Sequence, residues 1–394
     1  MFETLKAQPA DKILSLMAAY RADPRVEKVD LGVGVYKDAD GKTPVMRAVK
    51  AAEKQLWDIE DTKSYTGLAG DVGFHDVMRR LILADAVAAE QIAAAATPGG
   101  TGAIRQGLEL IKMAAPQATI WLSAPTWPNH PSIIKYLGMP MAEYRYFDSA
   151  TRGVDFGGML TDLDQAKPGD VVLLHGCCHN PTGANLTASQ WQEVADFLKS
   201  KQLIPFVDIA YQGFGDGLDA DAYGPRHLAK TQPEMLIAAS CSKNFGVYRE
   251  RTGLLMAISQ DPAKTPLNQG TVAFLNRQNY SFPPDHGARL VTMVLNDETL
   301  RTDWQKELED IRGSMLSLRQ QLSDALRKRT NSDKFDFLAQ HRGMFSRLGA
   351  TEAQVEQMRE SHGIYMVSDS RLNLAGLNAQ SVPILADAIV AAGV

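Results

Sequence analysis

The stretch that decides the fold runs from Val171 to Ile209 and reads VVLLHGCCHNPTGANLTASQWQEVADFLKSKQLIPFVDI. Apolar runs of strand length open and close it, at Val171–Leu174 and Leu203–Ile209. Between them, over Gln190–Lys201, four apolar residues share one helical face: Trp191, Val194, Ala195 and Leu198. Thr187-Ala-Ser-Gln190 precedes this helix and fits a capping box. The order strand, helix, strand predicts a parallel βαβ unit.

Two further apolar runs extend this unit on either side, at Ala118–Ser123 and Met235–Ala239. All four runs are almost continuously apolar and do not alternate with polar residues. That pattern is expected for strands of a sheet that helices cover on both faces. The sequence therefore predicts an α/β domain built around a mainly parallel sheet.

The C-terminal part of the chain follows a different pattern. From Glu298 to Arg329, apolar residues recur every three or four positions: Leu300, Trp304, Leu308, Ile311, Met315, Leu318, Leu322 and Leu326. We interpret them as one face of a long packed helix, with a coiled coil as the alternative. A helix over Glu352–Ser361 then precedes strands at Ile364–Val367 and Arg371–Leu374. We expect this part to form a second, smaller α+β domain.

The overall composition excludes several classes of protein. The 394 residues are 45% hydrophobic and 22% charged, which excludes a wholly disordered or fibrous chain. A net charge of −5 gives no general attraction to nucleic acid or to an anionic membrane. No segment approaches the ~20 continuous apolar residues of a membrane span, and we interpret Ala84–Ala96 as a surface helix. The first residues contain no apolar stretch of signal-peptide type, so we expect a cytoplasmic protein.

The three cysteines are Cys177, Cys178 and Cys241, and an odd number fits a reducing compartment better than a disulfide framework. The sequence Cys177-Cys178-His179 raises the question of a metal site. Adjacent residues near the end of a strand are expected to point to opposite faces, and no second ligand pair follows at a usable spacing. Buried packing is therefore the preferred interpretation, and we expect no bound metal.

Polar and aromatic side chains follow each of the four apolar runs. In chain order they include Trp127 and His130; His175, His179 and Asn180; Asp208 and Tyr211; and Lys243 and Arg251. Ligands of open parallel sheets bind beyond the carboxyl ends of the strands, so these groups together predict a site at one edge of the sheet. We interpret His175 and His179 as structural.

A phosphate site is suggested by Thr97-Pro-Gly-Gly100-Thr101-Gly102, which opens a helix with apolar residues at Ile104, Leu108 and Ile111. Glycines let the backbone approach an anion, and the helix N-terminus offers free N–H groups. The motif is neither the dinucleotide pattern nor a Walker A loop, which disfavours a nucleotide. A Gly-rich turn without a ligand is the alternative interpretation.

Lys243 is the pivotal residue of this sequence. Most lysines are solvated surface charges, but Lys243 follows a buried run within a Ser- and Gly-rich turn, and Arg251 lies further along. A lysine amine can condense with a carbonyl cofactor, and a guanidinium can bind a phosphate with two hydrogen bonds. Pyridoxal phosphate needs a lysine, a phosphate cradle, an acidic partner for its ring nitrogen and donors to its phenolate oxygen.

Over essentially its whole length, the chain resembles the class-I aminotransferases of the aspartate and aromatic amino acid branch. The matching stretches are Leu31-Gly-Val-Gly34-Val-Tyr36, Lys63-Ser-Tyr65, Pro98-Gly-Gly-Thr-Gly102, Trp127-Pro-Asn-His130, Cys177-Cys-His-Asn-Pro-Thr-Gly183, Asp208-Ile-Ala-Tyr211-Gln-Gly-Phe214, Ser240-Cys-Ser-Lys-Asn-Phe-Gly246, Arg277-Gln-Asn-Tyr-Ser281 and Ser370-Arg371-Leu-Asn373. The resemblance implies a fold-type-I transferase that depends on pyridoxal 5'-phosphate and forms a homodimer with shared active sites. It also implies an N-terminal arm at 1–11, a small domain from 12–43 and 311–394, and a large cofactor-binding domain at 44–310.

The resemblance gives five residues a role in catalysis or next to the cofactor ring. Lys243 matches the lysine that holds the cofactor as a Schiff base and then moves the Cα proton. Asp208 matches the carboxylate that pairs with the ring nitrogen, and His130 matches a residue behind that carboxylate. Tyr211 and Asn180 match donors to the phenolate oxygen, which tune the pKa of the Schiff base.

The remaining matches concern the phosphate, the ring face and the substrate. Trp127 matches the indole that lies against the ring and the substrate, and Asn180 also borders the substrate. The phosphate contacts match Gly100, Thr101, Ser240 and Arg251, with Tyr65 coming from the partner subunit. The substrate contacts match Arg371, which binds the α-carboxylate, Gly34 beside it, and Arg277, which comes from the partner and binds a side-chain carboxylate. Without the family resemblance, Arg371 could be a surface charge beside Asp369.

Two positions depart from the pattern of aspartate-specific relatives. Phe282 stands where such relatives usually carry a polar residue, and Arg347 stands near Phe345 in a stretch that is usually more aromatic. Phe282 would make the substrate entrance more apolar. Together with the stretch from Asp208 to Gly215, it favours the aromatic members of the family.

The resemblance therefore implies a broad-specificity aromatic amino acid aminotransferase. It would transfer the amino group of phenylalanine, tyrosine or tryptophan, and of aspartate or glutamate, to 2-oxoglutarate by a ping-pong mechanism. An aspartate aminotransferase is the first alternative, and a lyase on the same scaffold is the second. A cofactor-sensing regulator is disfavoured because the chain has no spare basic domain to bind DNA.

Overall fold

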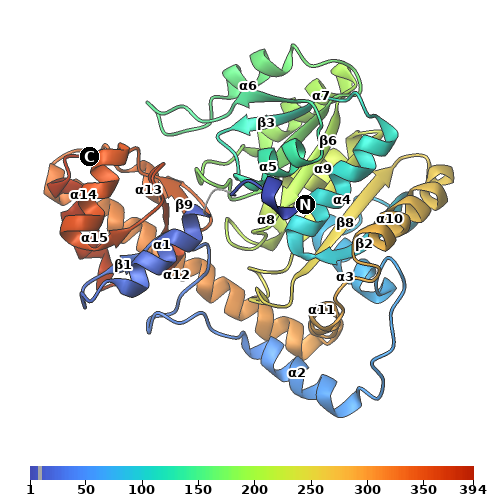
Figure 1. The fold of residues 1–394 in the computed structure, drawn as a ribbon, viewed down its shortest axis with the longest axis horizontal. Coiled ribbons are helices and arrows are strands. Elements are labelled where there is room, and N and C mark those ends of the chain that lie inside the picture. Colours follow the sequence, from blue (N-terminus) through green and yellow to red (C-terminus); the bar gives the residue numbers. More distant parts are fainter. Residues whose placement is uncertain (8–10) are drawn as a thin grey trace. The chain divides into compact units, whose positions relative to one another are not determined.

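The computed structural model describes residues 1–7 and 11–394 (Figure 1). The chain divides into two compact units, each of which is described by itself. The larger unit consists of 44–314 and 341–343, and the smaller unit of 1–43, 315–340 and 344–394. The predicted N-terminal arm at 1–11 includes residues 8–10, which lie outside the described residues; Phe2–Thr4 form the short helix η1.

The larger unit is built around a seven-stranded sheet in the order β2-β8-β7-β6-β5-β3-β4. In that order the strands are Ile92–Pro98, Thr252–Ser259, Glu234–Ser240, Ile204–Ile209, Val171–His175, Ile120–Ala124 and Met141–Arg145. The five strands from β7 to β4 pair in parallel, whereas β8 is antiparallel to both of its neighbours. The prediction of a mainly parallel α/β sheet is confirmed, because the four apolar runs form β3, β5, β6 and β7.

Both faces of this sheet are buried. Helices α4 (Gly99–Ala114) and α10 (Thr265–Asn279) share one apolar core cluster with alternate strand residues such as Leu173 and Phe206. Strand residues between these, which face the other way, are also buried: Val172, Leu174, Val207 and Ile237. The continuous apolar runs of the sequence therefore reflect a sheet that is covered on both sides.

The predicted capping box is present at the start of α7 (Ala188–Lys201). The Gln190 N–H donates to Thr187 Oγ1 at 3.2 Å, and the Thr187 N–H donates to Gln190 Oε1 at 2.9 Å. Two backbone groups that the helix itself leaves without partners are thus satisfied. The remaining helices of the larger unit are α2 (Arg47–Ile59), α3 (Val72–Leu83), α5 (Asn129–Tyr136), α6 (Phe156–Leu163), α8 (Leu218–Asp221), α9 (Tyr223–Thr231) and α11 (His286–Asn296).

The prediction of a surface helix over Ala84–Ala96 is wrong. Ala89–Gln91 form the short helix η2, and Ile92–Pro98 form the edge strand β2, in which Ala93 to Ala96 are buried. Gln269 of α10 holds this strand by accepting from the Ala94 N–H and donating to its carbonyl, both at 2.9 Å. The helix propensity of alanine is a weak preference. In this segment it is outweighed by the pairing of β2 with β8 and by the contacts of β2 with α10.

The smaller unit contains two short sheets and its own core. Strand β1 (Val29–Asp30) pairs in parallel with β10 (Ile364–Tyr365), and β9 (Phe345–Arg347) pairs antiparallel with β11 (Arg371–Asn373). The helices are α1 (Lys12–Ala22), α13 (Phe337–Gln340), α14 (Glu352–His362) and α15 (Ser381–Ala391). An apolar cluster forms the core, with residues from β1, β10, β11, α13, α14, α15 and the C-terminal half of α12 (Glu298–Thr330).

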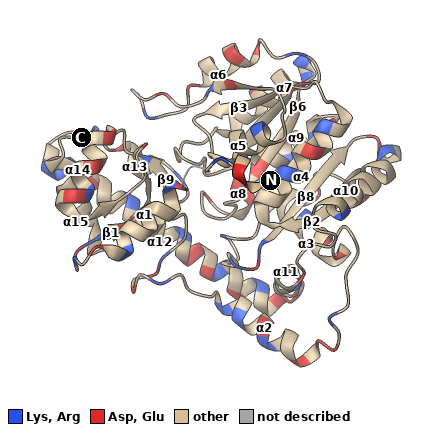
Figure 2. Ribbon diagram, in the orientation of Figure 1, with Lys and Arg blue, Asp and Glu red and all other residues tan. Residues whose placement is uncertain are grey.

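The long helix of the sequence is α12 (Glu298–Thr330), whose residues up to Ser314 belong to the larger unit and the rest to the smaller. All eight apolar residues of its predicted face, from Leu300 to Leu326, are buried. They pack within the chain, which supports the packed helix over the coiled coil. Figure 2 shows residues of both charge signs along α12 and α2. Among the described residues, no helix is long and apolar enough to cross a membrane.

Residues 341–343 belong to the larger unit although the sequence placed them with the C-terminal part. His341 Nε2 lies 2.8 Å from the carbonyl oxygen of Arg152, and the Arg342 N–H donates to the Gly183 carbonyl at 2.9 Å. Arg342 also forms an ion pair with Asp216 at 2.7 Å. These polar contacts are not encoded in any local sequence pattern.

Candidate active site

A cavity of the larger unit lies at the carboxyl ends of the parallel strands. Its wall is formed by the start of α4, by the ends of β5, β6 and β7, and by the segments that follow β3, β5, β6 and β7. The residues are Gly100, Thr101, Trp127, His175, Cys177, Asn180, Asp208, Ala210, Tyr211, Ser240, Ser242, Lys243 and Arg251. The structure thus brings together all of the predicted cofactor contacts except Tyr65. It does so because the parallel strands β5, β6 and β7 end at the same edge of the sheet.

Asp208, near the end of β6, supplies the cavity with a buried carboxylate. His130 Nε2 lies 3.0 Å from Asp208 Oδ2, and Thr126 Oγ1 lies 2.9 Å from His130 Nδ1. Burial opposes ionisation of Asp208, but the hydrogen bond from His130 and the nearby Lys243 charge outweigh it and lower the pKa. Asp208 is therefore an ionised, fixed partner for a positively charged group in the cavity.

Lys243 follows β7 and presents its amine to the same cavity. Burial lowers the pKa of Lys243 to about 8; Asp208 opposes this shift, whereas Arg251 adds to it. Its Nζ lies 4.8 Å from the centroid of the Tyr211 ring. Because the pKa is lowered, more of the amine is unprotonated at neutral pH, and that is the form that attacks a carbonyl carbon.

The start of α4 forms an anion cradle with Arg251 and Ser240. Gly99 has φ 72°, and a Cβ there would lie 2.4 Å from Arg251 Nη2. A Cβ at Gly100 would lie 3.0 Å from the Ser240 Cβ. The two glycines therefore let the helix N-terminus, a guanidinium and a hydroxyl approach one another closely. These are the donors that bind a phosphate.

Tyr65 and Arg277 lie on the surface of the larger unit, outside the cavity. The Tyr65 side chain is 84% exposed, and its ring stacks on Phe282 with centroids 4.7 Å apart. The Arg277 guanidinium lies 5.8 Å from the centroid of the same Phe282 ring, and its Nη1 donates to Ser281 Oγ at 2.9 Å. Both residues are thus accessible to a second molecule, and their roles across a subunit boundary stay predictions.

Arg371 is a buried residue of the smaller unit and not a surface charge beside Asp369. Its Nη2 donates to the Gly32 carbonyl at 2.8 Å, and its guanidinium lies 4.4 Å from the centroid of the Phe345 ring. A Cβ at Gly34 would lie 2.9 Å from the Phe345 ring, so a larger residue would displace that ring. The guanidinium, Gly34 and the aromatic ring therefore form one fixed group.

His175 was interpreted as structural, but it also lines the cavity. Its Nε2 lies 3.2 Å from Thr126 Oγ1, which links it to His130 and so to Asp208. Burial lowers the pKa of His175 to about 3, so the ring is neutral at neutral pH. His175 pairs in register with Asp208 across β5 and β6, and that register is the signal that could have identified it.

The expectation that Cys177 and Cys178 point to opposite faces is wrong. Their sulfur atoms lie within 4.8 Å of each other and of an Asp221 carboxylate oxygen. The pair lies after the end of β5, and Cys178 has a φ of 51°, so the alternation of an extended strand does not continue through it. Cys177 also lines the cavity, as does Ser242, which the sequence analysis did not single out.

Comparison with known proteins gives a consistent result. A family model described as aminotransferase class I and II matches residues 26–389. An aromatic-amino-acid aminotransferase of Paracoccus denitrificans is 59% identical over 394 residues, covering all of both chains. An aspartate aminotransferase of Haemophilus influenzae is 42% identical and covers 99% of both chains.

Solved structures are similar over the same length. An aromatic amino acid aminotransferase with 3-indolebutyric acid has a TM-score of 0.98 and 59% identity, covering all of both chains. An aromatic-amino-acid aminotransferase from Burkholderia pseudomallei, covalently bound to pyridoxal phosphate, has a TM-score of 0.97 and 38% identity. It covers all of this chain and 99% of its own.

Proposed function

Because the chain belongs to the class I and II aminotransferases, we propose that it transfers the amino group of aromatic amino acids to 2-oxoglutarate. Phenylalanine, tyrosine and tryptophan are the proposed main donors, and aspartate and glutamate are accepted as well. The observation that carries the proposal is the convergence of Lys243, Asp208 and the anion cradle in one cavity. The 59% identity to the Paracoccus aromatic-amino-acid aminotransferase and the apolar Phe282 support the aromatic preference.

The cofactor that these residues would hold is pyridoxal 5'-phosphate. Its phosphate fits the donors at Gly100, Thr101, Ser240 and Arg251. The glycines of this cradle carry no side chain and so leave room for the phosphate. The ionised Asp208 fits its ring nitrogen, while Asn180 and Tyr211 fit its phenolate oxygen and Trp127 its ring face. When bound, this cofactor supplies a carbonyl carbon for the amino group and a ring that accepts electrons from the substrate Cα.

Lys243 and Asp208 have complementary tasks in the proposed reaction. The Lys243 amine would hold the cofactor at rest, and as a free amine it would accept the Cα proton of the amino acid. Its pKa of about 8 lets it take up and release that proton near neutral pH. Asp208 would keep a proton on the ring nitrogen, and His130 fixes the carboxylate in place. The amino acid leaves as a 2-oxo acid before 2-oxoglutarate enters, so the kinetics are ping-pong.

We propose that the active enzyme is a homodimer in which each subunit completes the other's site. Tyr65 and Arg277 lie outside the cavity of their own unit and are exposed, as a contribution to a second copy requires. Tyr65 would reach the phosphate, and Arg277 would reach the side chain of the substrate. Arg371, with Gly34 beside it, would bind the α-carboxylate that every amino acid substrate carries.

Replacing Arg277 by leucine is expected to separate the two classes of substrate. A guanidinium can meet a side-chain carboxylate with two hydrogen bonds. Arg277→Leu should therefore lower kcat/KM for aspartate, with a loss of transition-state binding of about 2–5 kcal/mol. Phenylalanine carries no such carboxylate, so kcat/KM for phenylalanine should stay within about tenfold of the wild-type value, or roughly 1.4 kcal/mol. Arg277 can turn aside because it already rests against Phe282 and Ser281 on the surface. Steady-state kinetics with both donors measure the difference.

Arg371→Leu is the matched comparison, because it removes a guanidinium that both donors need. It should lower kcat/KM for phenylalanine and aspartate alike. An equal loss of both activities in Arg277→Leu would show that Arg277 is structural or binds something common to both substrates. The proposal for how one pocket accepts two substrate classes would then be wrong.

An amino-donor profile with 2-oxoglutarate as acceptor tests the proposed function itself. We expect glutamate to form with phenylalanine, tyrosine and tryptophan, and also with aspartate. Initial rates that are high with aspartate but negligible with all three aromatic donors would indicate an aspartate aminotransferase, like the Haemophilus relative. Release of a substrate side chain without glutamate formation would indicate a lyase.

A further inference from the structure

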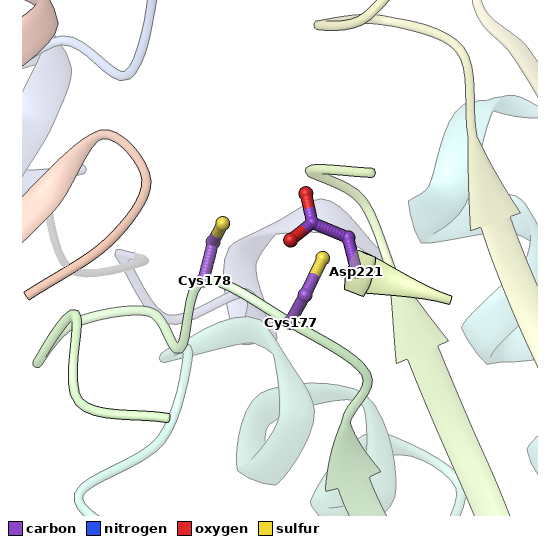
Figure 3. A group of neighbouring side chains, drawn as sticks. All are labelled: Cys177, Cys178 and Asp221. Atoms are coloured by element: carbon purple, nitrogen blue, oxygen red, sulfur yellow. The ribbon is translucent and has the colours of Figure 1, made fainter. Parts of the chain in front are cut away.

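Three potential ligand groups converge beside the cavity and have no part in the proposed reaction. The sulfur atoms of Cys177 and Cys178 and a carboxylate oxygen of Asp221 all lie within 4.8 Å of one another (Figure 3). All three residues are buried. Cys178 has a left-handed backbone conformation, with a φ of 51°, which is uncommon for a residue with a side chain.

The Asp221 carboxylate already has a structural task. Its Oδ2 accepts from the backbone N–H groups of Gly213 and Gly215 at 2.8 and 2.9 Å, and its Oδ1 accepts from the backbone N–H of Asp216 at 2.9 Å. Both of its oxygens therefore serve to hold the turn after β6. The two sulfur atoms are the soft ligands of the group, and soft ligands select thiophilic centres.

Cys178 is held in place by its neighbours, whereas Cys177 borders two cavities. A Cβ at Gly343 would lie 2.3 Å from the Cys178 Cβ, so the segment at Gly343 packs directly against that side chain. Cys177 lines the cofactor cavity and also a second cavity of about 330 Å³, whose wall includes Trp191 and Tyr223. The second cavity offers a path to Cys177 that does not pass through the cofactor site.

We propose that Cys177 and Cys178 form a dithiol site for a soft, thiophilic centre of low coordination number, such as trivalent organoarsenic. Zinc in structural sites takes four ligands, and calcium and magnesium take six or more oxygens. Neither set is available here, since two thiols converge with one carboxylate that already accepts three hydrogen bonds. A centre that needs two sulfur ligands fits the group. The site does not depend on the proposed aminotransferase function.

The binding step is a condensation and needs no oxidant. An arsonous acid, R–As(OH)₂, would exchange its two As–O bonds for two As–S bonds to the cysteines. The two thiol protons leave with the two hydroxides as two molecules of water.

Intact-mass spectrometry of the full chain after treatment with phenylarsine oxide tests the site. We expect one phenylarsine group per chain, which remains when cofactor is added and is removed by excess 2,3-dimercaptopropanol. Cys177→Ser and Cys178→Ser should each weaken retention by at least a hundredfold, because one sulfur ligand is lost. Cys241→Ser is the matched control, since Cys241 is also buried but lies apart from the pair, and the variant should bind as the wild type does.

Three results would overturn the proposal. The first is an adduct that survives in both single-serine variants. The second is an adduct that Cys241→Ser abolishes. The third is that the folded wild type forms no adduct, although the same chain is labelled once it has been denatured. Cys177→Ala and Cys178→Ala serve if a serine variant fails to fold, with circular dichroism as the check on folding.

Discussion

Lys243→Ala should lower the rate of amino transfer by at least about 10⁴-fold, the upper end of what one positioned acid–base group contributes. The reason is that a single amine is proposed both to hold the cofactor and to move the Cα proton. The variant should still fold, because Lys243 borders a cavity and does not fill the core. It can also still bind the cofactor non-covalently through the anion cradle. Initial rates with phenylalanine and 2-oxoglutarate measure the loss.

The visible absorption of the variant, before and after borohydride, provides the second readout. Borohydride should fix the cofactor to the wild-type protein but not to Lys243→Ala. Lys264→Ala is the matched control, since Lys264 is an exposed lysine of the same unit that pairs with Glu234. Cofactor fixed to another residue of Lys243→Ala, or nearly normal amino transfer, would refute the assignment.

Asp208→Ala should slow amino transfer by at least about a hundredfold. The proposed pair between Asp208 and the ring nitrogen is buried, and removing one member of such a pair typically costs ~3–5 kcal/mol. At ~1.4 kcal/mol per power of ten, that loss exceeds two powers of ten if it is expressed in the transition state. His130 would also lose the carboxylate that its Nε2 contacts at 3.0 Å.

Chemical rescue distinguishes this electrostatic role from a structural one. A cofactor analogue with a permanent positive charge on the ring nitrogen does not need a carboxylate to stay charged. It should therefore restore a large part of the activity of Asp208→Ala. A variant within tenfold of the wild type, on the order of 1.4 kcal/mol, would show that Asp208 is not the partner of the ring nitrogen.

Much of the larger unit could be predicted from the sequence because its strands are buried on both faces. Runs such as Val171–Leu174 are continuously apolar for that reason, and Thr187 marks the start of α7 by a local capping rule. The strand β2 could not be predicted in the same way. Its alanines favour helix locally, and only pairing with β8 and the contact with Gln269 make the segment extended.

The candidate site was predictable where it follows strand ends and less so elsewhere. Asp208 lies at the end of one apolar run and Lys243 shortly after another, so their place at one sheet edge follows from topology. His175 was placed at that edge as a structural residue, and its link to His130 through Thr126 could not be predicted because it depends on the register of β5 against β6. The approach of Cys177 to Cys178 depends on a left-handed backbone angle that no sequence pattern announces.

The attachment point of the cofactor in the wild-type protein tests the central claim most directly. The protein would be loaded with pyridoxal 5'-phosphate, reduced with borohydride, digested and mapped by tandem mass spectrometry. The account predicts that the reduced cofactor is found on Lys243, in the peptide that contains Ser240 to Gly246. Attachment to a different lysine, or no covalent attachment when the loaded protein is active, would contradict it.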